Sequence, residues 1–322
     1  MNKRMVVIGL IVMFAIPMVF AAGKPEIKEA KEPYVAVIMK SYSGDFWKTV
    51  EMGALNAGKE LGVRVTVEAP DTETNMEQQI KMIENAVTKG ADALAISVLD
   101  TKAMIPAIEG AAAAGVKIIT FNSMIDSKLP LTHVATDNWA AGELAGKALG
   151  EALGGVGKYA VLGAVQGVKN NRDRSDGAVD YIKKNYPGME LITIRYTDND
   201  LNNALAITSD LITSNPDIKG FFSNNETTTI AVSIVLEEKK QIGAIKQIGF
   251  DATPQTIGAL ENGIISAIVT QVPYQMGYLA VSSAKDALGG KTIPAVTDTG
   301  VALVTLDNLY NEDIQKIINP LK

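Results

Sequence analysis

The residue best placed to bind a ligand is Asp251, which directly follows an apolar strand predicted at 246–250. In open α/β sheets, ligand-contacting groups are presented at the carboxyl ends of the strands. Other predicted strands also end on polar side chains, namely Lys40, Ser97, Asn122, Thr136 and Ser223. Because these strand ends should converge on one cleft, the pattern predicts a binding site for a small molecule.

The amino terminus has the composition of a secretory signal. Lys3 and Arg4 precede an apolar stretch at 5–20, and Val19-Phe20-Ala21 fits the small-residue pattern of a cleavage site,. The stretch is shorter than a comfortable membrane span, so an uncleaved anchor is the less favoured alternative. We therefore expect a signal peptide at 1–21, a leader at 22–33 and export to the periplasm.

The composition argues against several classes of protein. Asp and Glu number 36 against 30 Lys and Arg, which gives a net charge of −6. The chain also has no long basic run, so we do not expect nucleic acid as a partner,. The chain has no cysteine, which removes disulfides, thiol nucleophiles, thiolate metal sites and the usual lipid-anchor attachment. We expect a soluble mature chain without a metal or cofactor.

The apolar periodicity predicts an α/β fold, because short β-branched runs alternate with longer helical patterns. A first series has strands at 34–39, 64–68, 93–97, 117–121 and 132–135, with helices near 46–61, 76–89 and 102–114. A second series has strands at 158–162, 191–196, 220–223, 246–250 and 265–270, with helices near 173–185, 202–213 and 227–238. A helix at 273–288 and a strand at 301–304 follow, so the chain can cross between two lobes more than once.

Several motifs occur together in the order of a known family. They are Phe46-Trp47, Ala135-Thr136-Asp137-Asn138, Arg172-Asp173-Arg174-Ser175-Asp176-Gly177, Asn224-Asn225-Glu226, Gly249-Phe250-Asp251 and Gln271. Nearly the whole mature chain resembles the type I periplasmic solute-binding proteins, the ribose-binding and galactose-binding group of sugar ABC transporters. The resemblance implies two Rossmann-like lobes with parallel sheets, joined by a three-crossing hinge. It places the N-terminal lobe at 34–136 plus 272–300 and the C-terminal lobe at 137–271 plus 301–322.

The resemblance also implies roles for these side chains. Phe46 and Trp47 would sandwich a sugar ring, while Arg174, Asn225 and Asp251 would bond its hydroxyls. Such a division suits a sugar, which offers hydroxyl groups at its rim and apolar C–H faces. Each role has an alternative: the aromatics could be core, Arg174 could pair with a surface aspartate, Asp251 and Asn225 could cap helices, and Gln271 could serve only the hinge.

The chain also departs from the family pattern. Lys40 replaces a small hydroxyl residue, Ser97 replaces an asparagine, and Asn122-Ser123 replaces a charged pair. Asn199 and Leu201 replace an aromatic residue and an arginine. Lys40 could meet a ligand hydroxyl, a ligand carboxylate, Asp45 or Asp100. We expect an ordinary monosaccharide, with a deoxy or amino sugar, a polyol or autoinducer-2 left open.

The function implied by the resemblance is binding by closure. A monomer would capture a sugar between its lobes, close around it, and deliver it to an ABC transporter permease. The alternative is a sensor that presents its ligand to a chemoreceptor or histidine kinase. An enzyme is disfavoured because no dinucleotide, phosphate-loop or nucleophile motif occurs, and the single histidine, His133, lies in a predicted strand,. A LacI-type repressor is excluded because a signal occupies the place of the DNA-reading motif.

Overall fold

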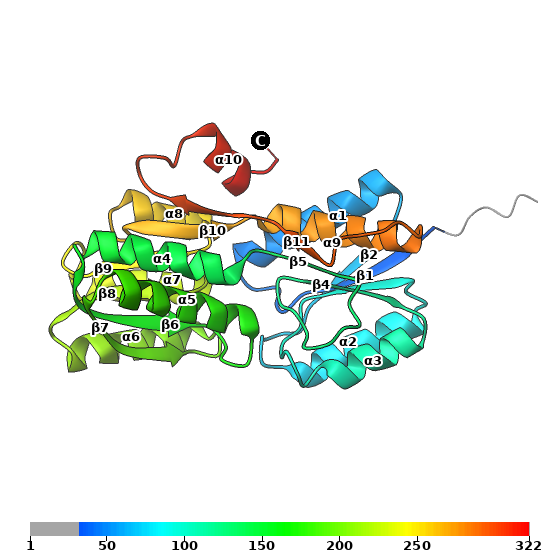
Figure 1. The fold of residues 1–322 in the computed structure, drawn as a ribbon, viewed down its shortest axis with the longest axis horizontal. Coiled ribbons are helices and arrows are strands. Elements are labelled where there is room, and N and C mark those ends of the chain that lie inside the picture. The colour runs from blue at the N-terminus through cyan, green and yellow to red at the C-terminus, as the bar shows by residue number, and fades with distance from the viewer. Residues whose placement is uncertain (1–31, 322) are drawn as a thin grey trace, which may run out of the picture. The chain divides into compact units, whose positions relative to one another are not determined.

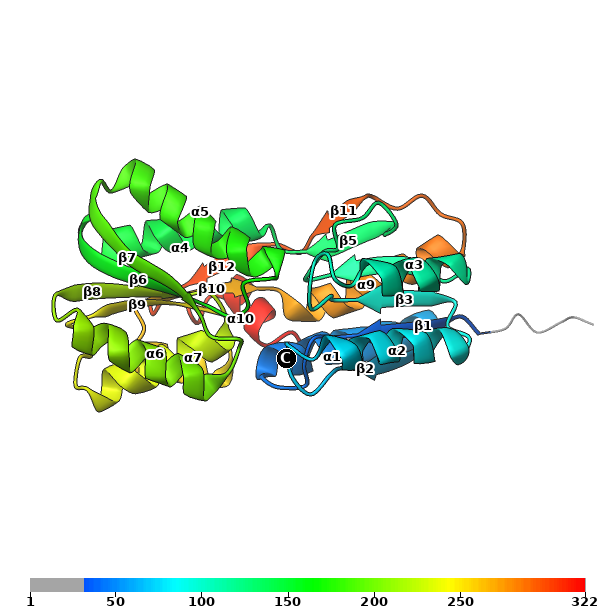
Figure 2. The same ribbon diagram turned by 90° about the horizontal axis from the view of Figure 1, so that it is seen from below.

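The computed structural model describes residues 32–321, so the predicted signal peptide and most of the predicted leader lie outside the described residues. The described chain forms two α/β lobes, each built on a six-stranded sheet (Figures 1 and 2). The first sheet is parallel throughout and has the order β11-β5-β4-β3-β1-β2. Its strands are β1 (Tyr34–Ile38), β2 (Arg64–Glu68), β3 (Ala93–Ile96), β4 (Lys117–Phe121), β5 (Thr132–Ala135) and β11 (Val296–Asp298).

Helices cover both faces of this sheet, as Figure 1 shows. Val35 and Val37 of β1 pack with helices α1 (Asp45–Leu61) and α9 (Pro273–Leu288). Tyr34, Ala36 and Ile38 of the same strand pack on the other side, with helices α2 (Met76–Thr88) and α3 (Ile105–Ala113). Burial on both faces explains why this strand is a continuous apolar run rather than an alternating one.

The second sheet has the order β12-β10-β9-β8-β6-β7. Its strands are β6 (Val156–Gly163), β7 (Gly188–Tyr196), β8 (Ile218–Ser223), β9 (Lys246–Phe250), β10 (Ala267–Gln271) and β12 (Val301–Val304). Helices α4 (Asn138–Ala152) and α5 (Lys169–Asn185) cover one face, and α6 (Leu201–Ser214) and α7 (Glu226–Glu238) cover the other. Two shorter helices, α8 (Pro254–Glu261) and α10 (Glu312–Ile318), share a further apolar cluster beside β10 and β12.

The chain passes between the two sheets at three places: from β5 to α4, from β10 to α9, and from β11 to β12. The first and third crossings are tied together. The hydroxyl of Thr136 lies 3.3 Å from that of Thr299 and donates to the carbonyl of Gly300 at 3.1 Å. Gly300 has a φ of 84°, which a residue without a Cβ adopts freely,. The predicted fold class, two lobes with three crossings, is confirmed.

Some details differ from the prediction. β12 runs antiparallel to β10, because it follows the third crossing directly and so enters the sheet at the edge where the parallel strands end. Strand β11 and helix α10 were not predicted, since each is short. Helix α5 begins at Lys169 rather than 173, because its first turn is entirely polar and carries no apolar periodicity.

Candidate ligand-binding site

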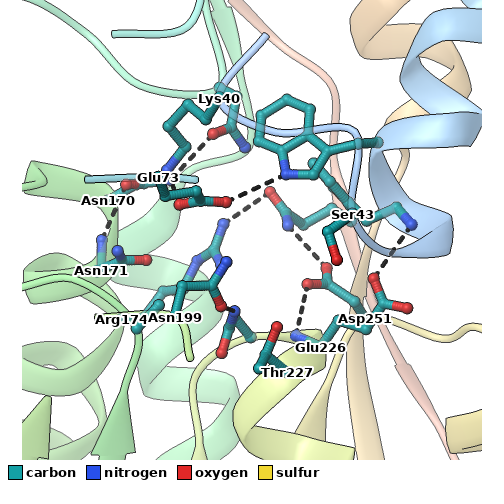
Figure 3. A pocket seen from close by; sticks show the side chains of 16 residues that line it. Lys40, Ser43, Glu73, Asn170, Asn171, Arg174, Asn199, Glu226, Thr227 and Asp251 are labelled. Atoms are coloured by element: carbon teal, nitrogen blue, oxygen red, sulfur yellow. Dashed lines mark hydrogen bonds and ion pairs between the residues drawn. The ribbon is translucent and has the colours of Figure 1, made fainter. Parts of the chain in front are cut away.

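A pocket of about 400 Å³ lies where the carboxyl ends of strands from both sheets meet. Figure 3 shows side chains of both lobes pointing into it. The lining is mostly polar and consists of Lys40, Ser43, Phe46, Trp47, Glu73, Asn122, Ala164, Asn170, Asn171, Arg174, Asn199, Asn225, Glu226, Thr227, Asp251 and Gln271.

Nine of the eleven residues predicted from the sequence line this pocket, namely Lys40, Phe46, Trp47, Asn122, Arg174, Asn199, Asn225, Asp251 and Gln271. The other two, Ser97 and Thr136, are outside the lining. Ser97 lies behind Asn122 as seen from the pocket, and its hydroxyl donates to Oδ1 of Asn122 at 3.3 Å. Thr136 bonds Gly300 at the crossing between the lobes. These two residues therefore support the pocket or the crossing rather than face the cavity.

Arg174 is buried and anchored by three hydrogen bonds. Its Nε donates to Oδ1 of Asn138 at 2.8 Å, Nη1 to the carbonyl of Asn224 at 3.0 Å, and Nη2 to Oε1 of Gln271 at 2.8 Å. Its guanidinium also lies 4.1 Å from the ring centroid of Phe250, a cation–π distance,. Burial lowers the pKa of Arg174 to about 10. The alternative that this arginine is only a surface ion-pair partner is therefore wrong.

Gln271 connects Arg174 to Asp251, since its Nε2 donates to Oδ1 of Asp251 at 2.8 Å. The second carboxylate oxygen of Asp251 accepts from the backbone N–H of Glu226 at 3.2 Å. Burial raises the pKa of the Asp251 carboxyl, although the charge of Arg174 and the bond from Gln271 act in the opposite direction. Arg174, Gln271 and Asp251 thus form a connected row of donors and acceptors along one wall of the pocket, in which one positive charge is paired with one negative charge.

Phe46 and Trp47 form the aromatic part of the lining. Their ring centroids lie 5.0 Å apart with an interplanar angle of 86°. Both rings also belong to the core beneath α1, where they are 7% and 5% exposed. Rings that meet edge to face at this distance cannot enclose a sugar ring between them. In this arrangement the pair offers an aromatic surface to one side of a ligand only.

Lys40 forms a buried ion pair with Glu73, a residue that the sequence analysis did not single out. Its Nζ lies 3.2 Å from Oε2 of Glu73, and the two side chains are 4% and 7% exposed. The other oxygen, Oε1, accepts from Nε1 of Trp47 at 3.2 Å. The partner of Lys40 is thus neither Asp45 nor Asp100. One carboxylate holds both the lysine and the indole against the pocket (Figure 3).

Glu226 reaches across the pocket to the first lobe. Its Oε1 and Oε2 accept from the backbone N–H groups of Asp45 and Phe46 at 3.0 and 3.2 Å. These are the first N–H groups of α1, whose own N-cap residue, Gly44, supplies no side-chain hydrogen bond. Burial raises the pKa of Glu226. The start of α1 is therefore capped by a carboxylate from the opposite lobe.

A second contact between the lobes involves amide groups. Nδ2 of Asn170 donates to Oδ1 of Asn122 at 3.3 Å, and the hydroxyl of Ser123 donates to Oδ1 of Asn170 at 3.3 Å. Nearby, Asn225 both caps α7, accepting from the N–H of Thr228 at 3.1 Å, and donates to Oδ1 of Asn199 at 2.7 Å. Asn225 therefore caps its helix, as the alternative held, but it is not only a cap, because it also lines the pocket.

A family model for the periplasmic binding protein domain matches residues 35–292. The chain belongs to this family. One relative in the family is the ribose import binding protein of Bacillus subtilis, 27% identical over 276 residues that cover 85% of this chain and 88% of the relative. The D-allose-binding periplasmic protein of Escherichia coli is 26% identical over 268 residues, which cover 80% and 86% of the two chains.

Solved structures of periplasmic binding proteins share the fold. A carbohydrate transporter solute-binding protein from Agrobacterium radiobacter, in complex with D-arabinose, is 34% identical with a TM-score of 0.87, over 90% of this chain and 99% of its own. An ABC transporter solute-binding protein from Agrobacterium vitis with bound D-fucose is 32% identical with a TM-score of 0.85, over 88% and 99%.

Within residues 32–321 of this periplasmic binding protein, no helix has the length and apolar character needed to cross a bilayer,. The same residues contain no group of three or more His, Asp or Glu side chains placed to hold a metal ion. His133 lies in β5, and its Nδ1 is 3.0 Å from the hydroxyl of Thr120. Burial lowers the pKa of His133 to about 4.

Seven lining residues were not among the site residues predicted from the sequence, although Glu226 stood in one of the quoted motifs; they are Ser43, Glu73, Ala164, Asn170, Asn171, Glu226 and Thr227. For some of these residues, the sequence contained a pattern that could have indicated them. Glu226 directly follows Asn225, and Asn170-Asn171 directly precedes the Arg172–Gly177 motif. Glu73 had none, because it lies on the connection between β2 and α2 rather than at a strand end.

Proposed function

We propose that this protein binds a monosaccharide in the pocket between its lobes and delivers it to the permease of an ABC transporter. The observation that carries the proposal is the likeness over most of the chain to structures that hold D-arabinose and D-fucose. The curated relatives are named for ribose import and allose binding. A transport role is therefore favoured over a sensory one.

The chemistry of the pocket fits a sugar. Asp251, Arg174 and Asn122 offer acceptors and donors for hydroxyl groups, and Trp47 offers an aromatic surface for a C–H face,. Since the lining comes from both lobes, a ligand that contacts both stabilises the closed arrangement. Binding would thus shift the population toward a closed form, which the permease would recognise.

The proposal includes the location and form of the protein. A signal peptide at 1–21 would direct export to the periplasm, where a monomer without catalytic activity would work. The hinge would divide an N-terminal lobe at 34–136 plus 272–300 from a C-terminal lobe at 137–271 plus 301–322. Mass measurement of the exported protein tests the cleavage site, and light scattering in solution tests the monomer.

A thermal-shift screen of the mature chain, from Ala22 onward, tests the function. The panel contains D-ribose, D-allose, D-arabinose, D-fucose, D-galactose and D-glucose, with amino acids and nucleosides as other classes. A ligand that binds only the folded state raises the melting temperature, so we expect a rise with at least one sugar. A rise with amino acids or nucleosides alone would refute sugar uptake. Sugar accumulation in cells with and without the gene then distinguishes transport from sensing.

A further inference from the structure

The charges around the pocket are not balanced. Its lining contains two cationic side chains, Lys40 and Arg174, and three carboxylates, Glu73, Asp251 and Glu226. The side-chain charges therefore sum to −1, and the carboxylate without a cationic partner is Glu226, whose charge the N-terminus of α1 offsets in part,. The remainder lies in a buried setting, where charges interact more strongly than in water. A ligand that carries a carboxylate would therefore meet net repulsion there, unless one cation were free to pair with it.

Arg174 is not free in this sense. Its Nη2 donates to Gln271, which in turn donates to Asp251, so guanidinium and carboxylate are joined through one amide. The charges of Asp251 and Glu73 also act directly on Arg174. Lys40 is therefore the cation that determines whether the pocket can bind an anionic ligand.

Lys40 is held by Glu73 at 3.2 Å, and both side chains are almost fully buried. Glu73 is itself fixed by the indole N–H of Trp47 at 3.2 Å. The pair is neutral as a unit but still polar, because an ammonium has three N–H groups and the carboxylate has several lone pairs. It can bond hydroxyl groups without attracting a charged ligand.

We propose that Glu73 determines the charge class of the ligand: by neutralising Lys40 it restricts the pocket to uncharged sugars and rejects sugar acids. The inference rests on the proposed function, since it concerns the same pocket. Specificity of this kind depends on repulsion of the wrong ligand as much as on attraction of the right one. In this site the repulsive element is the surplus carboxylate that remains once Lys40 is paired.

The substitution Glu73→Gln tests the role of charge with little change in shape. The amide oxygen can still accept from Trp47, but Lys40 becomes an unpaired buried cation. Isothermal titration compares neutral sugars with matched acids that keep the sugar ring: D-fucose and D-galactose with D-galacturonate, and D-glucose with D-glucuronate. D-galacturonate differs from D-fucose and D-galactose only at the exocyclic carbon, so it isolates the carboxylate.

We expect the wild-type protein to bind a neutral sugar and not its acid. Glu73→Gln should bind that acid at least about tenfold more tightly than the wild type does, because close buried charge pairs couple strongly. The matched control is the double variant Lys40→Met with Glu73→Gln, which removes both charges and should gain no affinity for the acid. Circular dichroism establishes that each variant is folded.

Two results would overturn the inference. One is wild-type binding of an acid as tight as that of its neutral partner. The other is a folded Glu73→Gln protein that still binds the neutral sugar but gains nothing for the acid. If this variant does not fold, Glu73→Ser replaces it, since the smaller side chain leaves room for water beside Lys40. Failure of every neutral sugar to bind the wild type would instead refute the proposed function.

Discussion

Asp251 combines an uncommon backbone conformation with the central position in the pocket. Its φ is 68°, in the left-handed region that Asp and Asn adopt more readily than most other residues,. Its two carboxylate oxygens accept from Gln271 and from the N–H of Glu226. The side chain is therefore held in one orientation before any ligand arrives, which reduces the entropy lost on binding.

The first prediction follows at this residue. Asp251→Asn keeps the shape and tolerates the positive φ, but it removes the charge. We expect sugar affinity to fall roughly 10- to 100-fold, because hydrogen bonds to charged groups contribute about 1.5–3 kcal/mol. Isothermal titration with the sugar that gives the largest thermal shift measures the effect. Asp210→Asn, at an exposed position of α6, is the control; equal affinities in both variants would remove Asp251 from the site.

At the scale of elements, the helices beside the pocket pack in close pairs. A Cβ on Gly142 of α4 would collide with the carbonyl oxygen of Arg174 in α5. One on Gly177 of α5 would lie 2.6 Å from the carbonyl oxygen of Trp139 in α4. In the first lobe, Gly53 and Gly277 allow the same approach between α1 and α9. These pairs set the position of the helices that carry Arg174 and the two aromatic residues.

The second prediction concerns this packing. Gly142→Ala should destabilise the protein by about 1–3 kcal/mol, the usual cost of forcing extra volume into packed structure. It should also weaken sugar binding, because α5 carries Arg174. Gly110→Ala in α3 is the control: nothing lies within 4 Å of its Cβ position, so the change should be neutral or stabilising,. Urea denaturation measures the free energy of unfolding of the two variants. Equal stabilities would contradict the packing argument.

The third prediction concerns the cap that Glu226 places on α1. Glu226→Gln loses the charge and one acceptor, so the closed arrangement loses stability. We expect sugar to dissociate roughly tenfold faster with little change in its association rate, since most interface changes act on dissociation. Stopped-flow fluorescence of Trp47, in a Trp139→Phe background, follows both rates.

Two further variants sharpen the test of this cap. Gly44→Ala should have a similar effect, because its Cβ would collide with the Glu226 carboxylate and its φ of 89° disfavours alanine. Glu238→Gln, at an exposed position near the end of α7, should change nothing. Unaltered dissociation from the Glu226→Gln protein would mean that the contact between the lobes adds nothing to closure.

At the scale of the whole molecule, closure depends on contacts between the lobes as well as on the ligand. The Glu226 cap and the Asn122–Asn170 amide contact join the lobes directly. Part of the free energy of closure is therefore present in the protein itself. A sugar that contacted both lobes would add to these contacts and so shift the equilibrium toward the closed form.

The fourth prediction concerns stability against pH. Burial lowers the pKa of His133 to about 4 in the folded state, so between about pH 6.5 and pH 4 the unfolded chain binds a proton that the folded protein does not. Stability is therefore lost as the pH falls through this window, by up to about 3 kcal/mol. His133→Gln should remove this loss.

Urea denaturation of both proteins at pH 7.5 and at pH 4.5 measures the difference. The raised pKa values of Asp251 and Glu226 favour the folded state as the pH falls, which is the opposite direction. Both proteins share them, so the comparison isolates His133. Identical pH dependence in the two proteins would show that burial does not lower the pKa of His133 in the folded state.

Much of the site could be predicted because its residues obey a local rule. Asn122 and Asp251 each follow a buried strand, and the carboxyl ends of parallel strands meet at one edge of a sheet. Ser97 and Thr136 obey the same rule but do not line the pocket. Ser97 points one step behind Asn122, and Thr136 turns toward the crossing. The direction of the last side chain depends on how the chain leaves the strand, which periodicity does not encode.

The amino-acid sequence alone determined the α/β class, the two series of strands, and most residues at the strand ends, because burial and turn chemistry are local properties of a chain. Only the tertiary structure decided which side chains interact with one another. Lys40 pairs with Glu73 rather than with Asp45, and Glu226 caps a helix that begins 181 residues earlier in the chain. Such contacts depend on how two lobes and a connecting loop come together in space. No local pattern of residue types specifies which of these distant residues will meet.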